Sequence, residues 1–218
     1  SAAPIQISYI GYLGTMGASY YDYLVADRTL IPEEKKHHYS EKIAYLPSYQ
    51  VNDSTQSLPE TIFTRQDVGI PEAAFVFCCF NNAYKITPTT FDSWGRILEQ
   101  VDNSVLLIYI KHEPAKTNLT KEIALRGIDP SRLIFAERLP KPEYLARYRV
   151  ADLFLDTLPY NAGTTASDAL CMGLPVLTCI GSSFASRMAA SVINAVNLPE
   201  LITTSQEQYE SLAVELAT

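Results

Sequence analysis

The stretch that decides the fold is ADLFLDTLPYNAGTTASD, which runs from Ala151 to Asp168. Its apolar first part predicts a strand over Asp152–Leu158, and its last part predicts a helix over Thr164–Met172. A turn of mostly small residues joins the two. Because strand, short turn and helix form the repeating unit of parallel sheets, the stretch predicts an α/β protein.

The same alternation continues on both sides of this stretch. The strand segments are almost continuously apolar, as is typical of strands covered on both faces. We therefore predict a doubly wound parallel sheet. The further strands are predicted at Ala73–Phe80, Val105–Lys111, Leu133–Ala136 and Pro175–Ile180, and the further helices at Pro88–Val101, Leu119–Arg126, Lys141–Val150, Ala185–Val196 and Gln206–Leu216.

Several residues mark the predicted helix ends. Thr87 can cap the helix that begins at Pro88, where the missing N–H of proline costs nothing. Gly127 and Gly173 follow helices and can adopt the left-handed conformation that ends them.

The chain divides into three parts. Residues 1–49 contain a predicted strand at Ile5–Ile10 and a tyrosine-rich polar stretch. Residues 50–72 are polar with little periodicity, which predicts a linker. Residues 73–218 hold the regular alternation of strands and helices and form the predicted main domain.

The composition is that of an acidic globular protein. Apolar residues make up 47% of the 218, and 17 Lys and Arg against 24 Asp and Glu give a net charge of −7. This charge argues against broad binding to nucleic acid or anionic membranes, and no apolar run approaches the roughly 18 residues of a membrane helix. The chain starts at Ser1 without a leader, so we expect a cytoplasmic protein and a piece of something longer.

Cysteine and histidine spacing indicates no metal site. The three histidines lack the spacing of metal ligands and have no cysteine placed for nucleophilic catalysis. Four cysteines lie in apolar stretches without a CxxC pair and are predicted to be reduced core residues: Cys78, Cys79, Cys171 and Cys179.

The turn before the helix at Thr164 is a candidate anion site. The free N–H groups and positive dipole end of a helix attract phosphate, and Gly163 allows close approach of the backbone. Thr164 and Thr165 add hydroxyls, and Asp168 lies one turn further along, where it can face sugar hydroxyls. The alternative is a plain helix cap with Asp168 as an exposed charge.

Two other turns supply cations. Lys85 follows a predicted strand and can neutralise a diphosphate leaving group; the alternative is a solvated lysine. Lys141 and Tyr144 share a helix face, with Arg147 within reach, so a base could stack on Tyr144 beside two cations. The alternative is an ordinary amphipathic helix.

Together the three turns predict a pocket for a nucleoside diphosphate, because the carboxyl ends of parallel strands share one sheet edge. The chain has neither the G-x-x-x-x-G-K-[ST] motif of nucleoside triphosphatases nor the G-x-G-x-x-G motif of dinucleotide sites. The loop with Gly14, Thr15 and Gly17 is predicted to touch the ligand from the other side, near the donor sugar; the alternative is a plain turn.

Several stretches, in this order, resemble the catalytic region of the O-GlcNAc transferase and SPINDLY-like glycosyltransferases. They are APIQISYIGYLGTMG (3–17), YSEKIAYLP (39–47), FNNAYKITP (80–88), ADLFLDTLPYNAGTTASD (151–168) and GLPVLT (173–178). The resemblance implies a GT-B architecture of two Rossmann-like lobes. Residues 1–49 would end the N-terminal lobe, and residues 73–218 would form the C-terminal, nucleotide-sugar-binding lobe.

The resemblance also implies roles for single residues. The lysine matching Lys85 contacts the donor diphosphate and is the catalytic residue of this chain, while Asn82 would lie by the sugar or diphosphate. The remaining donor-binding positions are Gly163, Thr164 and Thr165 for the phosphates, Lys141 and Asp168 for the ribose, and Leu139 (by its backbone), Tyr144 and Arg147 for the base.

The implied reaction is inverting, metal-independent transfer of a sugar, GlcNAc from UDP-GlcNAc in the first place, to Ser or Thr of a protein. Implied partners are the remaining N-terminal lobe, tetratricopeptide repeats and a protein acceptor. Gly163 and Asn82 stand where animal enzymes have His and Gln, which looks more like SPINDLY and its bacterial relatives, some of which use GDP-fucose. The short linker favours a bacterial source. Two further hypotheses are a nucleotide-sugar-binding module that is inactive in isolation, and a GT-B enzyme with lipid or glycan acceptors.

Overall fold

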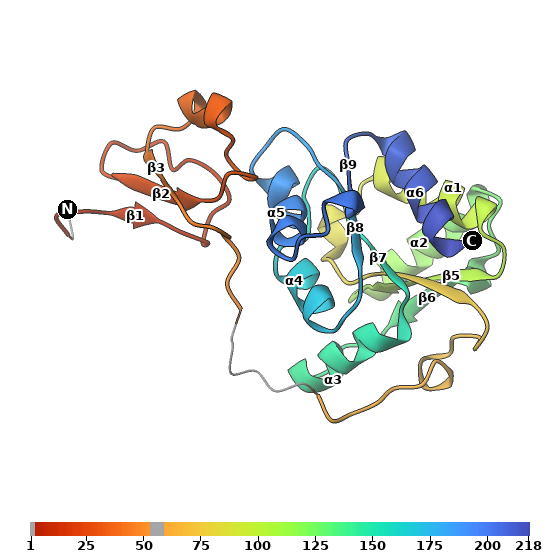
Figure 1. Cartoon of the computed structure of the whole chain (residues 1–218). Helices are drawn as coiled ribbons and strands as arrows, with labels where there is room; N and C mark the ends of the chain where they lie inside the picture. The colour runs from red at the N-terminus through yellow and green to blue at the C-terminus, as the bar shows by residue number, and fades with distance from the viewer. Residues whose placement is uncertain (1–2, 53–58) are drawn as a thin grey trace.

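The computed structural model describes residues 3–52 and 59–218, which build two parallel sheets (Figure 1). The smaller sheet has the order β1-β2-β3. The larger sheet has six strands, all paired in parallel, which confirms the predicted α/β class. The strands are β1 (Ile7–Ser8), β2 (Tyr23–Ala26), β3 (Lys42–Tyr45), β4 (Phe75–Cys79), β5 (Ser104–Tyr109), β6 (Leu133–Ala136), β7 (Leu153–Leu155), β8 (Val176–Cys179) and β9 (Ile202–Thr203).

The order of the larger sheet is β6-β5-β4-β7-β8-β9. The chain therefore starts at the centre with β4, moves outward to β6, returns to the centre at β7 and moves outward on the other side. This is the doubly wound order, and its direction reverses between β4 and β7. The crevice beyond the carboxyl ends of these two strands is the place where such sheets bind ligands.

Helices of this lobe cover the sheet as the sequence predicts, with small differences at their ends. Thr87 caps α1 by accepting a hydrogen bond from the N–H of Thr90, and Gly127 and Gly173 have φ angles of 79° and 80°. The second helix begins earlier than predicted, because Pro114 fits its first turn. The helices are α1 (Pro88–Gln100), α2 (Glu113–Leu125), α3 (Lys141–Arg147), α4 (Thr164–Cys171), α5 (Met188–Ala195) and α6 (Gln206–Ala217).

The prediction for residues 1–49 is incomplete. The first strand is shorter than Ile5–Ile10 and covers only Ile7–Ser8, and β2 and β3 lie in the stretch that we predicted to be polar and irregular. Both are four residues long, and β3 has no fully buried residue, so their apolar pattern is weak. Parallel pairing of β2 with both neighbours stabilises them instead.

The predicted linker lies partly outside the described residues, since 53–58 are not among them. Its later part contains a short 3₁₀ helix, η2 (Gln66–Val68). Arg65 fixes this part to the main sheet by donating two hydrogen bonds to the Asp152 carboxylate, 2.9 and 2.8 Å long, at the start of β7.

Most of the predicted core is buried as expected. Cys78, Cys79 and Cys179 are free and buried, but Cys171 is exposed, which corrects its prediction as a core residue. Cys171 ends α4 and its sulfur accepts a hydrogen bond from Asn52, so it lies on the side of the helix that faces away from the sheet core. Among the described residues, no helix is long and apolar enough to cross a membrane.

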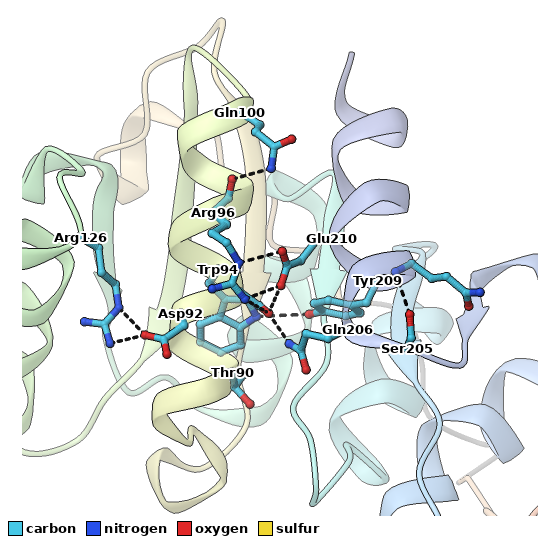
Figure 2. Close-up of polar contacts among 12 residues, drawn as sticks. Thr90, Asp92, Trp94, Arg96, Gln100, Arg126, Ser205, Gln206, Tyr209 and Glu210 are labelled. Carbon is cyan, nitrogen blue, oxygen red and sulfur yellow. Dashed lines mark hydrogen bonds and ion pairs between the residues drawn. The ribbon is translucent and has the colours of Figure 1, made fainter.

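The C-terminal helix is held against α1 by a polar cluster (Figure 2). Arg96 pairs with Glu210 at 2.6 Å, and the indole N–H of Trp94 donates to the Tyr209 hydroxyl at 3.2 Å. Trp94 and Tyr209 are both buried. This contact joins the end of the chain to the central strands of the sheet.

The small sheet is attached to the main lobe through α5. Phe184 and Met188 pack into the small sheet's own apolar cluster. The buried carboxylate of Asp27 accepts hydrogen bonds from the N–H groups of Thr29 and Leu30 (both 2.9 Å), from that of Tyr49 (3.1 Å) and from the Ser191 hydroxyl on α5.

We expect Asp27→Ala to lower the free energy of unfolding by about 3 kcal/mol, because it leaves several buried donors without an acceptor. Urea denaturation would measure the change. Asp102→Ala, at an exposed position, is the control and should change stability by no more than about 0.5 kcal/mol. An equally small effect of the Asp27 variant would contradict this role.

Candidate functional site

A pocket of about 380 Å³ opens where the strand order reverses. Its wall comes from the segment after β4, the ends of β5 and β6, α3 and the start of α4. All of the residues predicted to bind the donor belong to this wall except Lys141 and Asp168. The wall residues are Phe80, Asn81, Asn82, Lys85, Tyr109, Glu137, Arg138, Leu139, Tyr144, Arg147, Gly163, Thr164 and Thr165.

The first turn of α4 presents unpaired backbone N–H groups to this pocket. The first α-helical bond runs from the Ser167 N–H to the Gly163 carbonyl, and no side chain of residues 3–52 or 59–218 caps the helix. A Cβ atom at Gly163 would lie 3.1 Å from the Met188 methyl group, so a larger residue here would have to displace Met188. The helix end is therefore open for an anion.

The two threonines at this turn differ. Thr164 is exposed, whereas the Thr165 hydroxyl donates its proton to the side-chain carbonyl of Asn81. The Thr165 hydroxyl therefore serves to hold Asn81, and a contact of this hydroxyl with phosphate stays a prediction. The backbone N–H of Thr165 remains on the open end of α4.

Lys85 lies beside this turn in the pocket wall, at the end of the short 3₁₀ helix η3 (Ala83–Lys85). Its ammonium donates to the Asn161 carbonyl at 2.9 Å and lies 4.0 Å from the centre of the Tyr160 ring. Burial lowers the pKa of Lys85, and the nearby Asp156 opposes that change. The alternative of a freely solvated lysine is wrong.

The predicted base pocket is lined by aromatic rings and one buried cation. Arg147 is 2% exposed and lies 4.4 Å from the centre of the Phe80 ring. Its Nη1 donates to the Glu137 carbonyl, while its Nε has no partner among the described residues. Burial lowers the pKa of Arg147. Tyr144 lies beside it, with 5.8 Å between the guanidinium carbon and the ring centre.

Lys141 and Asp168, both predicted at the ribose, contact each other. The Lys141 ammonium lies 2.9 and 3.1 Å from the two Asp168 oxygens. Asp168 is thus neither a solvated charge nor free, and its side chain is more buried than that of Lys141. The carboxylate oxygens can still accept further hydrogen bonds from sugar hydroxyls.

The glycine loop reaches the site through other residues than predicted. Thr15 donates to Glu41 at 2.6 Å and so serves to anchor the loop. A hollow of about 200 Å³ adjoins the main pocket, sharing Lys85, Gly163 and Thr164 with it. Its full wall is Ile10, Gly11, Leu13, Gln50, Lys85, Tyr160, Gly163, Thr164 and Met188, so the roles of Gly14, Thr15 and Gly17 at a donor sugar stay a prediction.

Sequence reasoning missed the polar residues beneath the pocket. Asp156 and Asn81 are buried and hydrogen-bonded to each other and to the turn above them. Asn161 supplies the carbonyl that binds Lys85. The one signal in the sequence was a charged residue that directly follows an apolar strand, since a buried Asp requires partners.

This geometry suits a nucleoside diphosphate. Open helix N–H groups and the half-buried Lys85 line one region, an aromatic and cationic region lies at one end, and a smaller hollow lies at the other. Among residues 3–52 and 59–218, no three His, Cys, Asp or Glu side chains are grouped so that they could hold a metal ion.

Comparison with known proteins agrees with this geometry. The sequence matches the family model of glycosyl transferase family 41 over residues 1–62 and 52–218. It is 39% identical over 222 residues to the probable UDP-N-acetylglucosamine–peptide N-acetylglucosaminyltransferase SEC of Arabidopsis thaliana, covering 99% of this chain and 23% of that protein. It is 32% identical to the SPINDLY protein of rice, with the same two coverages.

Solved structures give the same result. A mutant of the Thermobaculum terrenum O-GlcNAc transferase matches with a TM-score of 0.86 and 30% identity, covering 99% of this chain and 41% of that one. A sucrose-phosphate synthase from Thermosynechococcus elongatus, at 14% identity and a TM-score of 0.50, shares the fold alone. The chain thus spans less than half of the length of these relatives.

We expect Lys85→Ala to weaken UDP binding by about 1–3 kcal/mol, because a charge-assisted contact to the diphosphate is lost. Calorimetric titration would measure the affinity. Lys111→Ala, at an exposed position after β5, is the matched control and should bind UDP normally. Equal UDP affinities of the two variants would contradict the role of Lys85 in diphosphate binding.

Proposed function

The chain belongs to glycosyl transferase family 41, and from this membership we propose that it forms the donor site of an inverting protein O-GlcNAc transferase. The donor would be UDP-GlcNAc and the acceptor a Ser or Thr hydroxyl. The observation that carries the proposal is that the start of α4, which no described side chain caps, lines one pocket with Lys85 at the carboxyl ends of β4 and β7.

In this reaction the site would have to stabilise the diphosphate leaving group. When the bond between the sugar and the diphosphate breaks, negative charge grows on the diphosphate. Backbone N–H groups at Gly163 to Thr165 and the Lys85 ammonium would meet that charge in fixed positions, which is how preorganised donors lower a barrier. The proton of the acceptor hydroxyl would go to a base outside this chain.

The rest of the donor would extend in both directions from the diphosphate. We place the base beside Tyr144, Arg147 and the Leu139 backbone, and the ribose at Lys141 and Asp168. The sugar would occupy the hollow whose loop wall is Ile10, Gly11 and Leu13, with Asn82 near its junction with the diphosphate.

The acceptor side requires more protein than this chain. β1 is an edge strand with β2 as its partner in the described residues, and Ile5, Ile7, Tyr12 and Tyr20 near it are 55–60% exposed. We propose that the remaining N-terminal lobe of a longer cytoplasmic protein, which also carries tetratricopeptide repeats, covers this edge. Alone, the chain would bind donor without orienting an acceptor.

Calorimetric titration of the chain with UDP, GDP, UDP-GlcNAc and GDP-fucose, in the presence of EDTA, tests the proposal. We expect selective binding of the two uridine nucleotides without metal. Selective binding of the guanosine nucleotides would replace the donor by GDP-fucose. Binding of none of them, by this chain and by a longer one with the N-terminal lobe, would refute the donor site.

We expect Asp168→Asn to weaken both uridine and UDP roughly tenfold, because its proposed partner is the ribose that the two ligands share. Glu200→Gln, at an exposed carboxyl group, is the control for loss of a negative charge. A loss seen with UDP but absent with uridine would contradict the ribose contact.

A further inference from the structure

Asp156 is a buried carboxylate that the proposed donor contacts do not use. It follows β7 directly and is 4% exposed. No ion pair within 4 Å joins it to a described Lys or Arg. Burying a carboxylate without a cation in contact costs free energy. The hydrogen bonds and charges around Asp156 must therefore stabilise it.

Three neutral groups donate to this carboxylate. Oδ1 accepts from the Ala162 N–H at 2.7 Å and from the Asn81 amide at 3.3 Å, and Oδ2 accepts from the Thr178 hydroxyl at 2.7 Å. These donors lie on the turn above, after β4 and on β8. Asp156 therefore ties together the strand ends that form the floor of the crevice.

The bond to Ala162 closes the turn formed by residues 157–163. Ala162 directly precedes Gly163 and the open N–H groups of α4. Asn81, the other partner of Oδ1, also accepts the Thr165 hydroxyl from the first turn of α4. The position of the helix end is therefore fixed through Asp156 from two sides.

The main chain of Asp156 is bound by a side chain of α6. The Tyr209 hydroxyl on α6 donates to the Asp156 carbonyl at 2.9 Å, and Trp94 on α1 donates to the same hydroxyl, as Figure 2 shows. The cluster between α1 and α6 thus supports the strand end that carries the carboxylate.

Asp156 and Lys85 carry opposite charges and bind neighbouring residues of the same turn, Asp156 the N–H of Ala162 and Lys85 the carbonyl of Asn161. Burial raises the pKa of Asp156 to about 6, and Lys85 lowers it; burial lowers the pKa of Lys85, and Asp156 raises it. The other titratable groups near the two are Cys79, Cys179, Tyr160 and Tyr209. Burial raises the pKa of each, so they are neutral at pH 7.

We propose that Asp156 is a positioning residue of the donor site. Its carboxylate closes the turn at residues 157–163, and this turn also supplies the Asn161 carbonyl that binds Lys85, so that the carboxylate is the counter-charge of this ammonium. The inference depends on the proposed function only for the identity of the ligand that the turn and Lys85 bind.

Asp156→Asn separates charge from shape. Both N–H donors face Oδ1, and only a hydroxyl faces Oδ2. An asparagine can therefore keep its oxygen toward Ala162 and Asn81 and donate its NH₂ to Thr178, whose hydroxyl can accept. This variant keeps the hydrogen bonds and loses the charge, whereas Asp156→Ala loses both.

The first measurement needs no ligand. NMR titration of ¹³C-lysine-labelled chain follows each ammonium, and Lys85→Arg identifies the Lys85 signal. We expect the titration midpoint of Lys85 to fall by about one pH unit in Asp156→Asn. Asp152→Asn, at the opposite end of β7, is the matched control and should leave it in place. An unchanged midpoint in Asp156→Asn would overturn the counter-charge.

The second measurement addresses the turn. We expect the Ala162 amide to stay protected from hydrogen exchange in Asp156→Asn and to lose protection in Asp156→Ala, with UDP affinity at least tenfold lower in the alanine variant. Full protection and normal affinity in Asp156→Ala would overturn the positioning role. If Asp156→Ala does not fold, Thr178→Val and Asn81→Ala, which each remove one partner, test the same link through Ala162 exchange.

The two proposals fail separately. A wild-type chain that binds no nucleotide, with a Lys85 midpoint that still falls in Asp156→Asn, would refute the donor site and leave the role of Asp156. A wild-type chain that binds UDP, with unchanged Lys85 titration and unchanged Ala162 protection in the Asp156 variants, would refute the role of Asp156 alone.

Discussion

The reversal of strand order between β4 and β7 is the constraint on which the rest of the structure depends. It brings two chain segments that are far apart in the sequence, the one with Lys85 and the one with Gly163, together in the wall of one crevice. Helix α4 then starts inside the crevice with its N–H groups unpaired. The anion site follows from the topology before any side chain contributes, and the side chains decide which anion binds.

Two desolvated cations, the half-buried Lys85 and the buried Arg147, distinguish this site from an ordinary surface cleft. Lys85 and Arg147 each lose solvation without gaining a carboxylate in contact, and the pKa of both groups is lowered as a result. Desolvated cations without a partner lower folding stability. In the proposed site, a bound diphosphate or base carbonyl would offset that loss. Cation–π contacts reduce this desolvation cost when no ligand is bound. Lys85 lies 4.0 Å from the centre of the Tyr160 ring, and Arg147 lies 4.4 Å from that of Phe80.

The sequence predicted the parts of the site that local rules control. Lys85 and Gly163 follow strands and precede helices, so the parallel-sheet pattern was enough to place them in one pocket. It was not enough for Asp156, whose partners come from β4 and β8, or for the pairing of Lys141 with Asp168. These contacts depend on tertiary distances. The same limit hid β2 and β3, which pairing with each other stabilises more than their own apolar pattern does.

The junction between the two sheets sets the geometry of the sugar end of the site. The hollow beside Lys85 takes part of its wall from the loop after β1 and another part from Met188 on α5. Met188 also packs into the cluster of the small sheet, and the bond from Ser191 to Asp27 fixes α5 to that sheet. A shift of the small sheet would therefore change the hollow while leaving the diphosphate region of β4, β7 and α4 intact. In the proposed donor site, binding of the nucleotide and orientation of the sugar would thus depend on different contacts, and only the second would depend on the packing between the two sheets.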